Sequence, residues 1–210
     1  MGGRTTGRQC FVLCADEKTS IQARRRLHST TPARPHQLTR VEHEYERLGA
    51  WAYLVAWDAH RARLFGRCER KTGIRPFGRL VGEVMRQPPY CDAERVYWIV
   101  DNGSSHRGQP SIRRMRRRYR RYPELVLVHL PIHASWLNQV EIYLSIVQRK
   151  VLTPNDCSNL REIPDRLLSF QRRYEAAAKP FRWEFTRHDL ANLLGRLDRN
   201  ADPAPLPRAA

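Results

Sequence analysis

The sequence is short of cysteine pairs and of long apolar runs. Its five cysteines include no C-x-x-C pair, and their odd number leaves one over. This usage argues against a disulfide framework and a zinc site, and it favours reduced thiols in a cytosol. No segment approaches the roughly 20 apolar residues of a membrane-spanning helix, and the N-terminus lacks the apolar core of a signal peptide. We therefore expect a soluble, cytoplasmic protein.

Acidic residues are also few in comparison with basic ones. The chain has 38 Lys and Arg against 21 Asp and Glu, which gives a formal net charge of +17. Most of the basic residues are arginines, whose planar guanidinium matches the geometry of a phosphate group. A basic surface can serve solubility alone, but an excess of this size favours a polyanion, and nucleic acid is the leading partner. No amphipathic anchor is evident, so a membrane is not an expected partner.

Arginine is concentrated between residues 112 and 122. There Ile112, Met115, Tyr119 and Tyr122 form an apolar stripe at helical spacing, and arginines crowd the rest of the same predicted helix. Like charges at this density repel one another unless a polyanion relieves them, so we expect the helix to contact the DNA backbone without reading its sequence. The alternative is a solvated helix face. The predicted DNA contacts are Arg113, Arg114, Arg117, Arg118 and Arg121.

Apolar periodicity predicts three strands, a helix, a strand, a helix, a strand and then further helices. The predicted strands are residues 10–15, 50–58, 61–69, 95–100 and 125–130, and the predicted helices are 76–86, 112–122, a helix from 138, 160–178 and 187–197. Residues 22–40 are basic, contain two prolines and are predicted to form a loop. This order predicts an α/β fold with a mixed five-stranded sheet flanked by helices, which is compatible with a ribonuclease H-like fold. We expect one domain over residues 1–200 and a disordered tail over 201–210.

Three acids follow or face predicted strands. Asp16 comes directly after the first strand, Asp101 ends the fourth, and Glu141 lies in the first turn of the helix after the fifth. Phosphoryl transfer by two metal ions needs carboxylates from separate elements, and strand ends and a facing helix are suitable mounts. Each acid has an alternative: Asp16 can be a solvated charge with Glu17 as the functional acid, Asp101 can belong to an Asn-Gly turn, and Glu141 can complete a capping box with Asn138. Spacing alone leaves these alternatives open.

Three ordered motifs together resemble the catalytic domain of bacterial transposases of the insertion-sequence-630 group, which are relatives of the mariner transposases in the DDE superfamily. The motifs are CADEKTSIQAR, WIVDNGSSHRG and LPIHASWLNQVEIYLSIVQRK, and the resemblance spans roughly residues 9–197. It implies a ribonuclease H-like core and a catalytic, metal-binding triad of Asp16, Asp101 and Glu141 that holds two Mg²⁺ or Mn²⁺ ions, with Asp16 contacting both. One departure is Gln139, which stands where mariner-type motifs usually have proline.

Residues beside the triad have two readings as well. Asn102 and His106 closely follow Asp101, and the resemblance implies that they position the scissile phosphate or a water molecule, whereas the alternative is an ordinary loop. Trp136 precedes the predicted catalytic helix and can stack on a base, but an aromatic residue of the core is the favoured interpretation.

The function implied by the resemblance is that of a metal-dependent DNA transposase, which cleaves a strand and then joins a 3′-hydroxyl to target DNA. The expected partners are double-stranded transposon ends and target DNA. A homodimer is one of the oligomeric states left open, and the DNA-bound protein is expected to be associated with the bacterial nucleoid. The rival hypotheses are a host ribonuclease H-like nuclease and an inactive DNA-binding remnant of a mobile element. The remnant is suggested because no helix-turn-helix recognition module is found before the first strand, so a separate or truncated catalytic domain is expected.

Overall fold

The computed structural model describes residues 9–103, 113, 115, 117–118, 120, 123–131, 134–182, 184 and 186–200. The chain divides into two compact units, Met1–Pro180 and Phe181–Ala210. The second unit contains helix α5 (Arg187–Asn200). The assignment of residues 1–200 to one catalytic domain stays a prediction, and the predicted tail at 201–210 lies outside the described residues.

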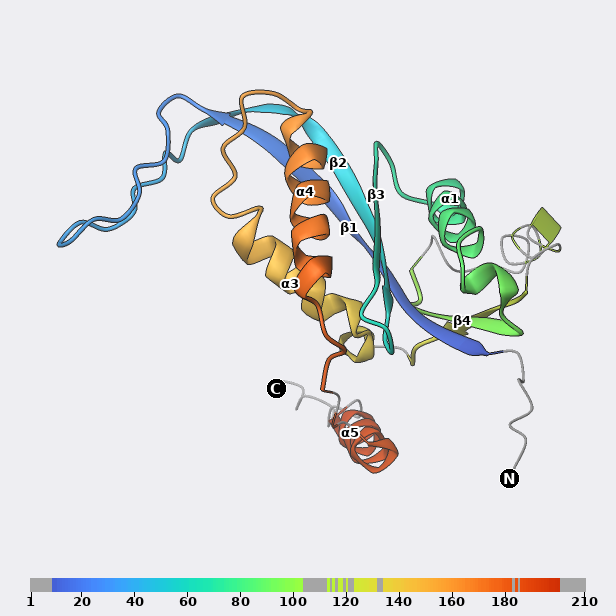
Figure 1. The fold of residues 1–210 in the computed structure, drawn as a ribbon. Coiled ribbons are helices and arrows are strands. Elements are labelled where there is room, and N and C mark those ends of the chain that lie inside the picture. The colour runs from blue at the N-terminus through green and yellow to red at the C-terminus, as the bar shows by residue number, and fades with distance from the viewer. Residues whose placement is uncertain are drawn as a thin grey trace, which may run out of the picture. The chain divides into compact units, whose positions relative to one another are not determined.

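A mixed five-stranded sheet forms the centre of the first unit (Figure 1). Its strands are β1 (Cys10–Arg26), β2 (Tyr45–Asp58), β3 (Leu64–Glu69), β4 (Arg95–Val100) and β5 (Glu124–His129), and they lie in the order β3-β2-β1-β4-β5. The first three strands form an antiparallel meander, and β4 and β5 run parallel to β1. This arrangement confirms the predicted α/β fold of ribonuclease H-like type.

Strand β1 is much longer than the sequence pattern predicts. It does not end at its acids but continues to Arg26, because β2 begins at Tyr45 and pairs with it over its whole far half. The prediction of a loop from residue 22 is therefore wrong for the first residues of that segment. The parallel pairing of β1 with β4 nevertheless ends at Cys14, which lies opposite Ile99. Asp16 therefore lies two residues beyond the last paired residue of β1.

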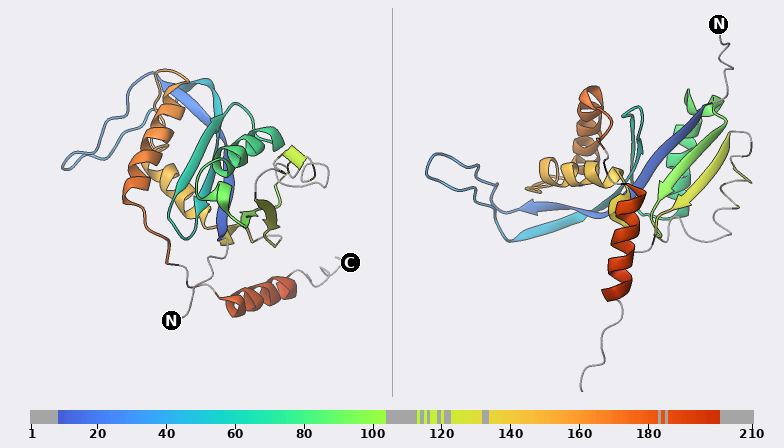
Figure 2. Two further views of the ribbon diagram at one scale, coloured as in Figure 1. Left: turned by 45° about the vertical axis from the view of Figure 1, so that its right-hand side comes forward. Right: turned by 90° about the horizontal axis from the view of Figure 1, so that it is seen from below.

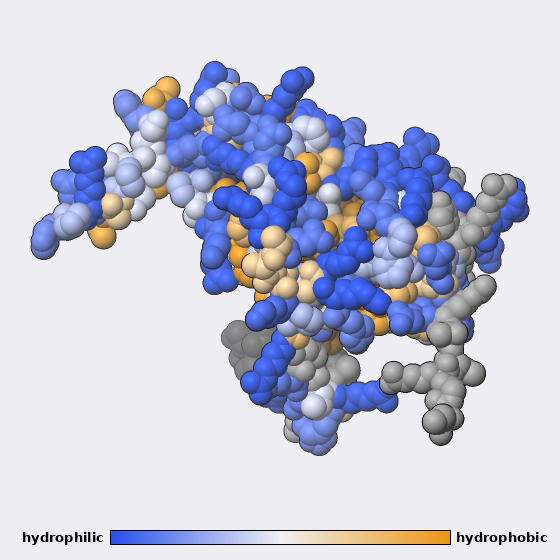
Figure 3. Space-filling view, in the orientation of Figure 1, coloured by the Kyte–Doolittle hydropathy of each residue, from blue (hydrophilic) through white to orange (hydrophobic). Residues whose placement is uncertain are grey.

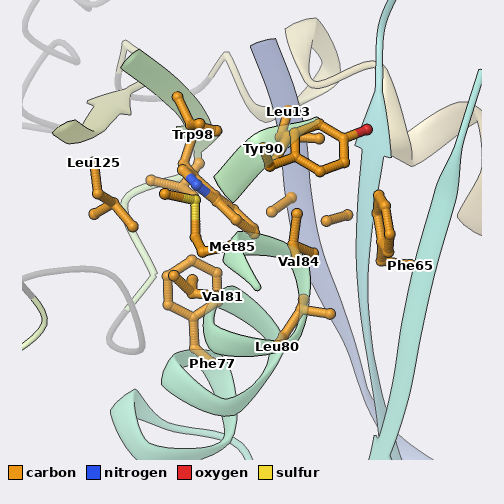
Figure 4. Packing of buried hydrophobic residues seen from close by; sticks show 14 of the residues in the cluster. Leu13, Phe65, Phe77, Leu80, Val81, Val84, Met85, Tyr90, Trp98 and Leu125 are labelled. Atoms are coloured by element: carbon orange, nitrogen blue, oxygen red, sulfur yellow. The ribbon is translucent and has the colours of Figure 1, made fainter. Parts of the chain in front are cut away.

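Helix α1 (Ile74–Met85) covers one face of the sheet with an apolar core. Phe77, Leu80, Val81 and Val84 recur at helical spacing and are almost fully buried against the strands (Figure 4). Trp98 of β4 meets Phe77 edge-on, with ring centroids 5.9 Å apart. The short 3₁₀-helix η1 (Tyr90–Asp92) closes this side with the buried ring of Tyr90.

Helices α3 (Val140–Lys150) and α4 (Glu162–Ala177) pack on the opposite face (Figures 1 and 2). The Tyr53 hydroxyl of β2 contacts the Tyr143 hydroxyl of α3 at 3.1 Å and donates to Gln171 Oε1 of α4 at 2.9 Å. Gly66 of β3 lies beneath this junction, where an added Cβ would stand 2.5 Å from the Tyr53 hydroxyl. The two helices are thus joined to the sheet by side-chain hydrogen bonds as well as by apolar packing.

The visible surface in Figure 3 is mostly hydrophilic, as the high net charge requires. Residues 27–44, which connect β1 to β2, carry the exposed apolar side chains Leu27, Leu38 and Val41. Among the described residues, no helix combines the length and the apolar character that a membrane crossing demands.

Candidate active site

Asp16 lies within β1 on the face covered by α3. Side chains alternate along a strand, and Leu13 and Ala15 belong to the core beneath α1, so Cys14 and Asp16 point to the other face. The Gln139 N–H, at the start of α3, hydrogen-bonds to Cys14 on that same face. The Glu17 N–H donates to Asp16 Oδ1 at 2.7 Å, which holds the carboxylate beside the strand. Alternation directs the Glu17 side chain to the opposite face, away from α3.

Asp101 follows the last residue of β4. The Gly103 N–H donates to Asp101 Oδ1 at 2.8 Å, so the carboxylate takes part in a turn of the Asx type. A Cβ on Gly103 would stand 2.8 Å from the same oxygen, and glycine leaves the room that this turn needs. The turn interpretation of the sequence is therefore correct in part, but Val100 belongs to the core beneath α1, so the next side chain along the strand is directed to the face of α3.

Asn102 connects two loops at the carboxyl ends of the parallel strands. Its Nδ2 donates to the Leu130 carbonyl at 2.6 Å, which ties the segment after β4 to the segment after β5. This contact gives the side chain a structural task beside Asp101, and its predicted role in positioning substrate stays a prediction. His106, the other predicted positioning residue, lies outside the described residues.

Glu141 lies in the first turn of α3, and the capping-box alternative is wrong. The residue before the helix, Gln139, makes no side-chain cap bond, and the Asn138 N–H donates to the Ser135 carbonyl of the 3₁₀-helix η2 (Ser135–Leu137) rather than to Glu141. The Glu141 carboxylate is therefore not occupied in capping its own helix. Gln139, which replaces the usual proline of the mariner-type motif, is itself in a helical conformation.

Asn138 is a site residue that the sequence patterns did not reveal. Its side chain is completely buried, and its Nδ2 donates to the Ala15 carbonyl at 2.9 Å. Ala15 directly precedes Asp16, and the Asn138 carbonyl accepts the Glu141 N–H at 2.9 Å. One buried amide therefore ties the strand that carries Asp16 to the helix that carries Glu141. An asparagine just before a helix has the sequence signature of a cap, which concealed this tertiary contact.

The three predicted acids influence one another. The pKa of Asp16 is raised from 3.8 to about 7, first by burial and then by the nearby carboxylates of Glu141 and Asp101, although the Glu17 N–H opposes the shift. Burial and like charges both disfavour the ionised form of a carboxyl group. The structure thus brings Asp16, Glu141 and Asp101 from three separate elements into one electrostatic neighbourhood.

The chemistry of this donor set suits a hard divalent cation. Mg²⁺ and Mn²⁺ prefer carboxylate oxygens, and a cation would remove the mutual repulsion that raises the pKa of Asp16. Across the part of the chain that the structure describes, no group of three or more His, Cys, Asp or Glu side chains is arranged so that it could hold a metal ion. The carboxylates of Asp16, Asp101 and Glu141 fit such an ion in chemical type.

The arginine-rich segment is described only at single residues. Arg113, Arg117 and Arg118 are helical and exposed, and Met115 is buried in the core beneath α1, as the predicted apolar stripe requires. Arg114 and Arg121 lie outside the described residues. The described part of this segment therefore buries one side and presents arginine on the other.

Trp136 does not belong to the core. It lies in η2, five positions before Glu141, and 41% of its surface is exposed. The expectation of a buried aromatic residue is wrong here, since the 3₁₀-helix turns the indole outward before α3 begins.

Comparison with known proteins supplies the family. Residues 11–163 match the family model described as DDE superfamily endonuclease, which is well over half of the chain. Among solved structures, the chain is similar to the Mos1 mariner transposase in a paired-end complex with Mn, with 17% sequence identity and a TM-score of 0.51 over 89% of this chain and 53% of that one. It is also similar to the Mos1 strand transfer complex, with 12% identity and a TM-score of 0.50 over 91% of this chain and 53% of that one.

At such low identity the Mos1 structures show a shared fold, and this chain spans about half the length of the transposase chains that it matches. No curated protein is significantly similar to it in sequence.

Proposed function

The chain belongs to the DDE superfamily endonuclease family, and we propose that it catalyses metal-dependent cleavage of a DNA strand and the joining of a 3′-hydroxyl to target DNA, as a bacterial transposase of the insertion-sequence-630 group. The observation that carries this proposal is the mutual influence of Asp16, Asp101 and Glu141 on the α3 face of the sheet. Both reactions are in-line displacements at phosphorus, so one set of residues can serve both.

The acids would act as ligands of two divalent ions. Such ions, when bound, lower the pKa of the attacking water and offset the charge that develops on the attacking and leaving oxygens. Asp16 would lie at the centre of the set, because the charges of both other carboxylates raise its pKa. Asp101 would be oriented by the Gly103 N–H, and Glu141 by the start of α3, which Asn138 ties to β1.

The basic surface would hold the substrate. Exposed Arg113, Arg117 and Arg118 favour contact with DNA phosphates, whose neutralisation supplies affinity that does not depend on sequence. Exposed Trp136 is close in sequence to Glu141, and its ring offers a surface on which a base at the cleaved end could stack.

The test measures cleavage of a labelled duplex in Mg²⁺ or Mn²⁺ by the wild-type chain and by Asp101→Asn. The variant should lose at least about a thousandfold in rate while its DNA affinity stays equal or rises, because it loses a ligand and a negative charge near phosphate. Glu17→Gln is the matched control, since Glu17 adjoins Asp16 but is directed to the other face. Cleavage at the wild-type rate by Asp101→Asn would refute the assignment.

The products of the same assay separate the rival functions. A transposase joins the 3′-hydroxyl of a pre-cut end to a second duplex, whereas a host nuclease yields only cleaved strands. An inactive remnant binds DNA and yields neither product. Joined products that disappear in Asp101→Asn are the expected result.

A further inference from the structure

A basic cavity lies farther along β1 from the three acids. It has a volume of about 420 Å³ and is formed by the far half of β1, the end of α3 and the loop that follows α3. Its cations are Lys18, Arg24 and Arg26, and its hydroxyl groups come from Thr19, Ser20 and Thr153. Cations together with hydroxyl donors are the groups that bind phosphate oxygens.

Positive charge in this cavity is only partly neutralised. Arg26 forms an ion pair with Asp156, whereas Lys18 and Arg24 form no ion pair with any residue that the structure describes. The Arg24 Nε is buried, and no described group accepts a hydrogen bond from it. A buried guanidinium donor without an acceptor is costly, and the negative charge of an anion in the cavity would offset part of that cost electrostatically.

Tyr45 lies beside two of the cations that line the cavity. The Arg24 guanidinium lies 4.5 Å and that of Arg26 5.7 Å from the centroid of the Tyr45 ring. The pKa of Tyr45 is lowered, first by a hydrogen bond with Arg47 and then by the charge of Arg24. The end of β1 and the start of β2 therefore form a region in which cations are held close together and an anion is favoured.

The cavity is placed on the same surface as the acids. Lys18 lies two residues after Asp16 and pairs with Tyr53, whose side chain contacts α3, so Lys18 shares the face of Asp16. Gln148, which also lines the cavity, is seven residues after Glu141 on α3, or about 10 Å along the helix axis. This separation equals the axial rise of roughly three nucleotides of one DNA strand.

We propose that the cavity binds a backbone phosphate of DNA a few nucleotides from the phosphodiester held at the acids. This inference rests on the proposed function. The bound phosphate is not cleaved; it fixes the position of the strand along the seam between β1 and α3, so that a defined phosphodiester lies at Asp16 and Glu141. Its recognition by Lys18 and Arg24 is independent of base sequence.

The test measures the affinity of a short duplex as a function of KCl concentration, in EDTA so that no cleavage occurs. Lys18→Ala and Arg24→Gln should each flatten the slope of log affinity against log salt by at most about 0.9, the value for one phosphate. Because Lys18 and Arg24 lie six residues apart on β1, the double variant should lose no more than the sum of the two single losses. Lys18→Arg, which keeps the charge, should restore the slope.

Arg25→Gln is the matched control. Arg25 adjoins Arg24 in β1 and is absent from the cavity lining, because it pairs with exposed Glu46. Equal slopes for Arg25→Gln and Arg24→Gln would overturn the proposal, as would unchanged slopes in both cavity variants. Melting curves of each variant establish that it is folded.

A second measurement separates a DNA phosphate from a free anion. Inorganic phosphate that raises the melting temperature of the wild-type chain but not of Arg24→Gln, with unchanged duplex slopes, would show a small-anion site and refute the DNA assignment. The outcome is also distinct from that of the cleavage test. If Asp101→Asn still cuts DNA while the slopes fall as expected, the catalytic assignment fails and the phosphate site stands.

Discussion

Two carboxylates on neighbouring strands, the fully buried Asp58 of β2 and the half-buried Asp16 of β1, have opposite surroundings. Asp58 is fully buried and accepts hydrogen bonds from the Tyr90 hydroxyl at 2.6 Å and from the His60 and Arg61 N–H groups at 3.0 Å each. Asp16 faces two other carboxylates, and its pKa is raised to about 7. A buried carboxylate whose oxygens accept hydrogen bonds stabilises the fold. A carboxylate placed among like charges destabilises the fold unless it binds a cation or a proton.

The same contrast separates the two faces of the sheet. The α1 face is an apolar core closed by aromatic residues, and the α3 face gathers acids, a buried amide and a tyrosine pair. Apolar packing on the α1 face supplies favourable free energy of folding, and this offsets the repulsion among the carboxylates on the α3 face. Changes on the α1 face should therefore alter stability alone, and changes near Asp16 should alter stability and the response to metal together.

The largest effect on stability is expected from Phe77→Ala. Phe77 is 1% exposed and packs edge-on against Trp98, so truncation should cost about 3–5 kcal/mol in the free energy of unfolding. Unfolding in urea measures the loss, and the rise in melting temperature on adding Mn²⁺ should keep its wild-type size. Leu38→Ala, at a side chain 88% exposed, is the control and should change little. A selective loss of the Mn²⁺ response in Phe77→Ala would break the contrast between the faces.

Asp16→Asn should have a smaller effect of opposite sign. The folded chain retains the Asp16 proton up to about pH 7, whereas the unfolded chain releases it near pH 3.8, so the stability of the wild type falls as pH rises between these values. In EDTA at pH 8 the variant should be more stable by about 2 kcal/mol, after allowance for solvent screening, and this gain should vanish towards pH 4. Melting curves across this pH range test the expectation. A variant less stable than the wild type at pH 8 would contradict it.

The smallest change is expected from Asn138→Ala. Loss of the bond to the Ala15 carbonyl should cost about 1 kcal/mol in stability and should weaken Mn²⁺ binding severalfold, because the start of α3 is no longer tied to β1 beside Asp16. Trp51→Phe is the matched control, since it removes the 2.9 Å bond from Trp51 Nε1 to the Leu160 carbonyl on the same face but away from the acids. Similar Mn²⁺ affinities in both variants would reduce Asn138 to a purely structural role.

The sequence by itself determined the order of the elements and the residue types of the candidate site. Alternation and helical spacing found the five strands and the helices that flank them, and β4 agrees in both ends, because these patterns reflect burial that each segment carries locally. The sequence also predicted three acids that follow or face strands, namely Asp16, Asp101 and Glu141. A carboxylate beside an apolar run can be recognised without knowledge of the fold.

Only the tertiary structure decided which of these groups meet. Strand β1 extends to Arg26 because β2 pairs with it, which no local pattern in a basic segment reveals. The same holds for Asn138, whose partner lies 123 positions away, and for the raised pKa of Asp16, which arises from acids on two other elements. Pairing, buried hydrogen bonds and electrostatic coupling depend on distances between segments remote in the chain, and those distances exist only once the sheet and α3 have packed together.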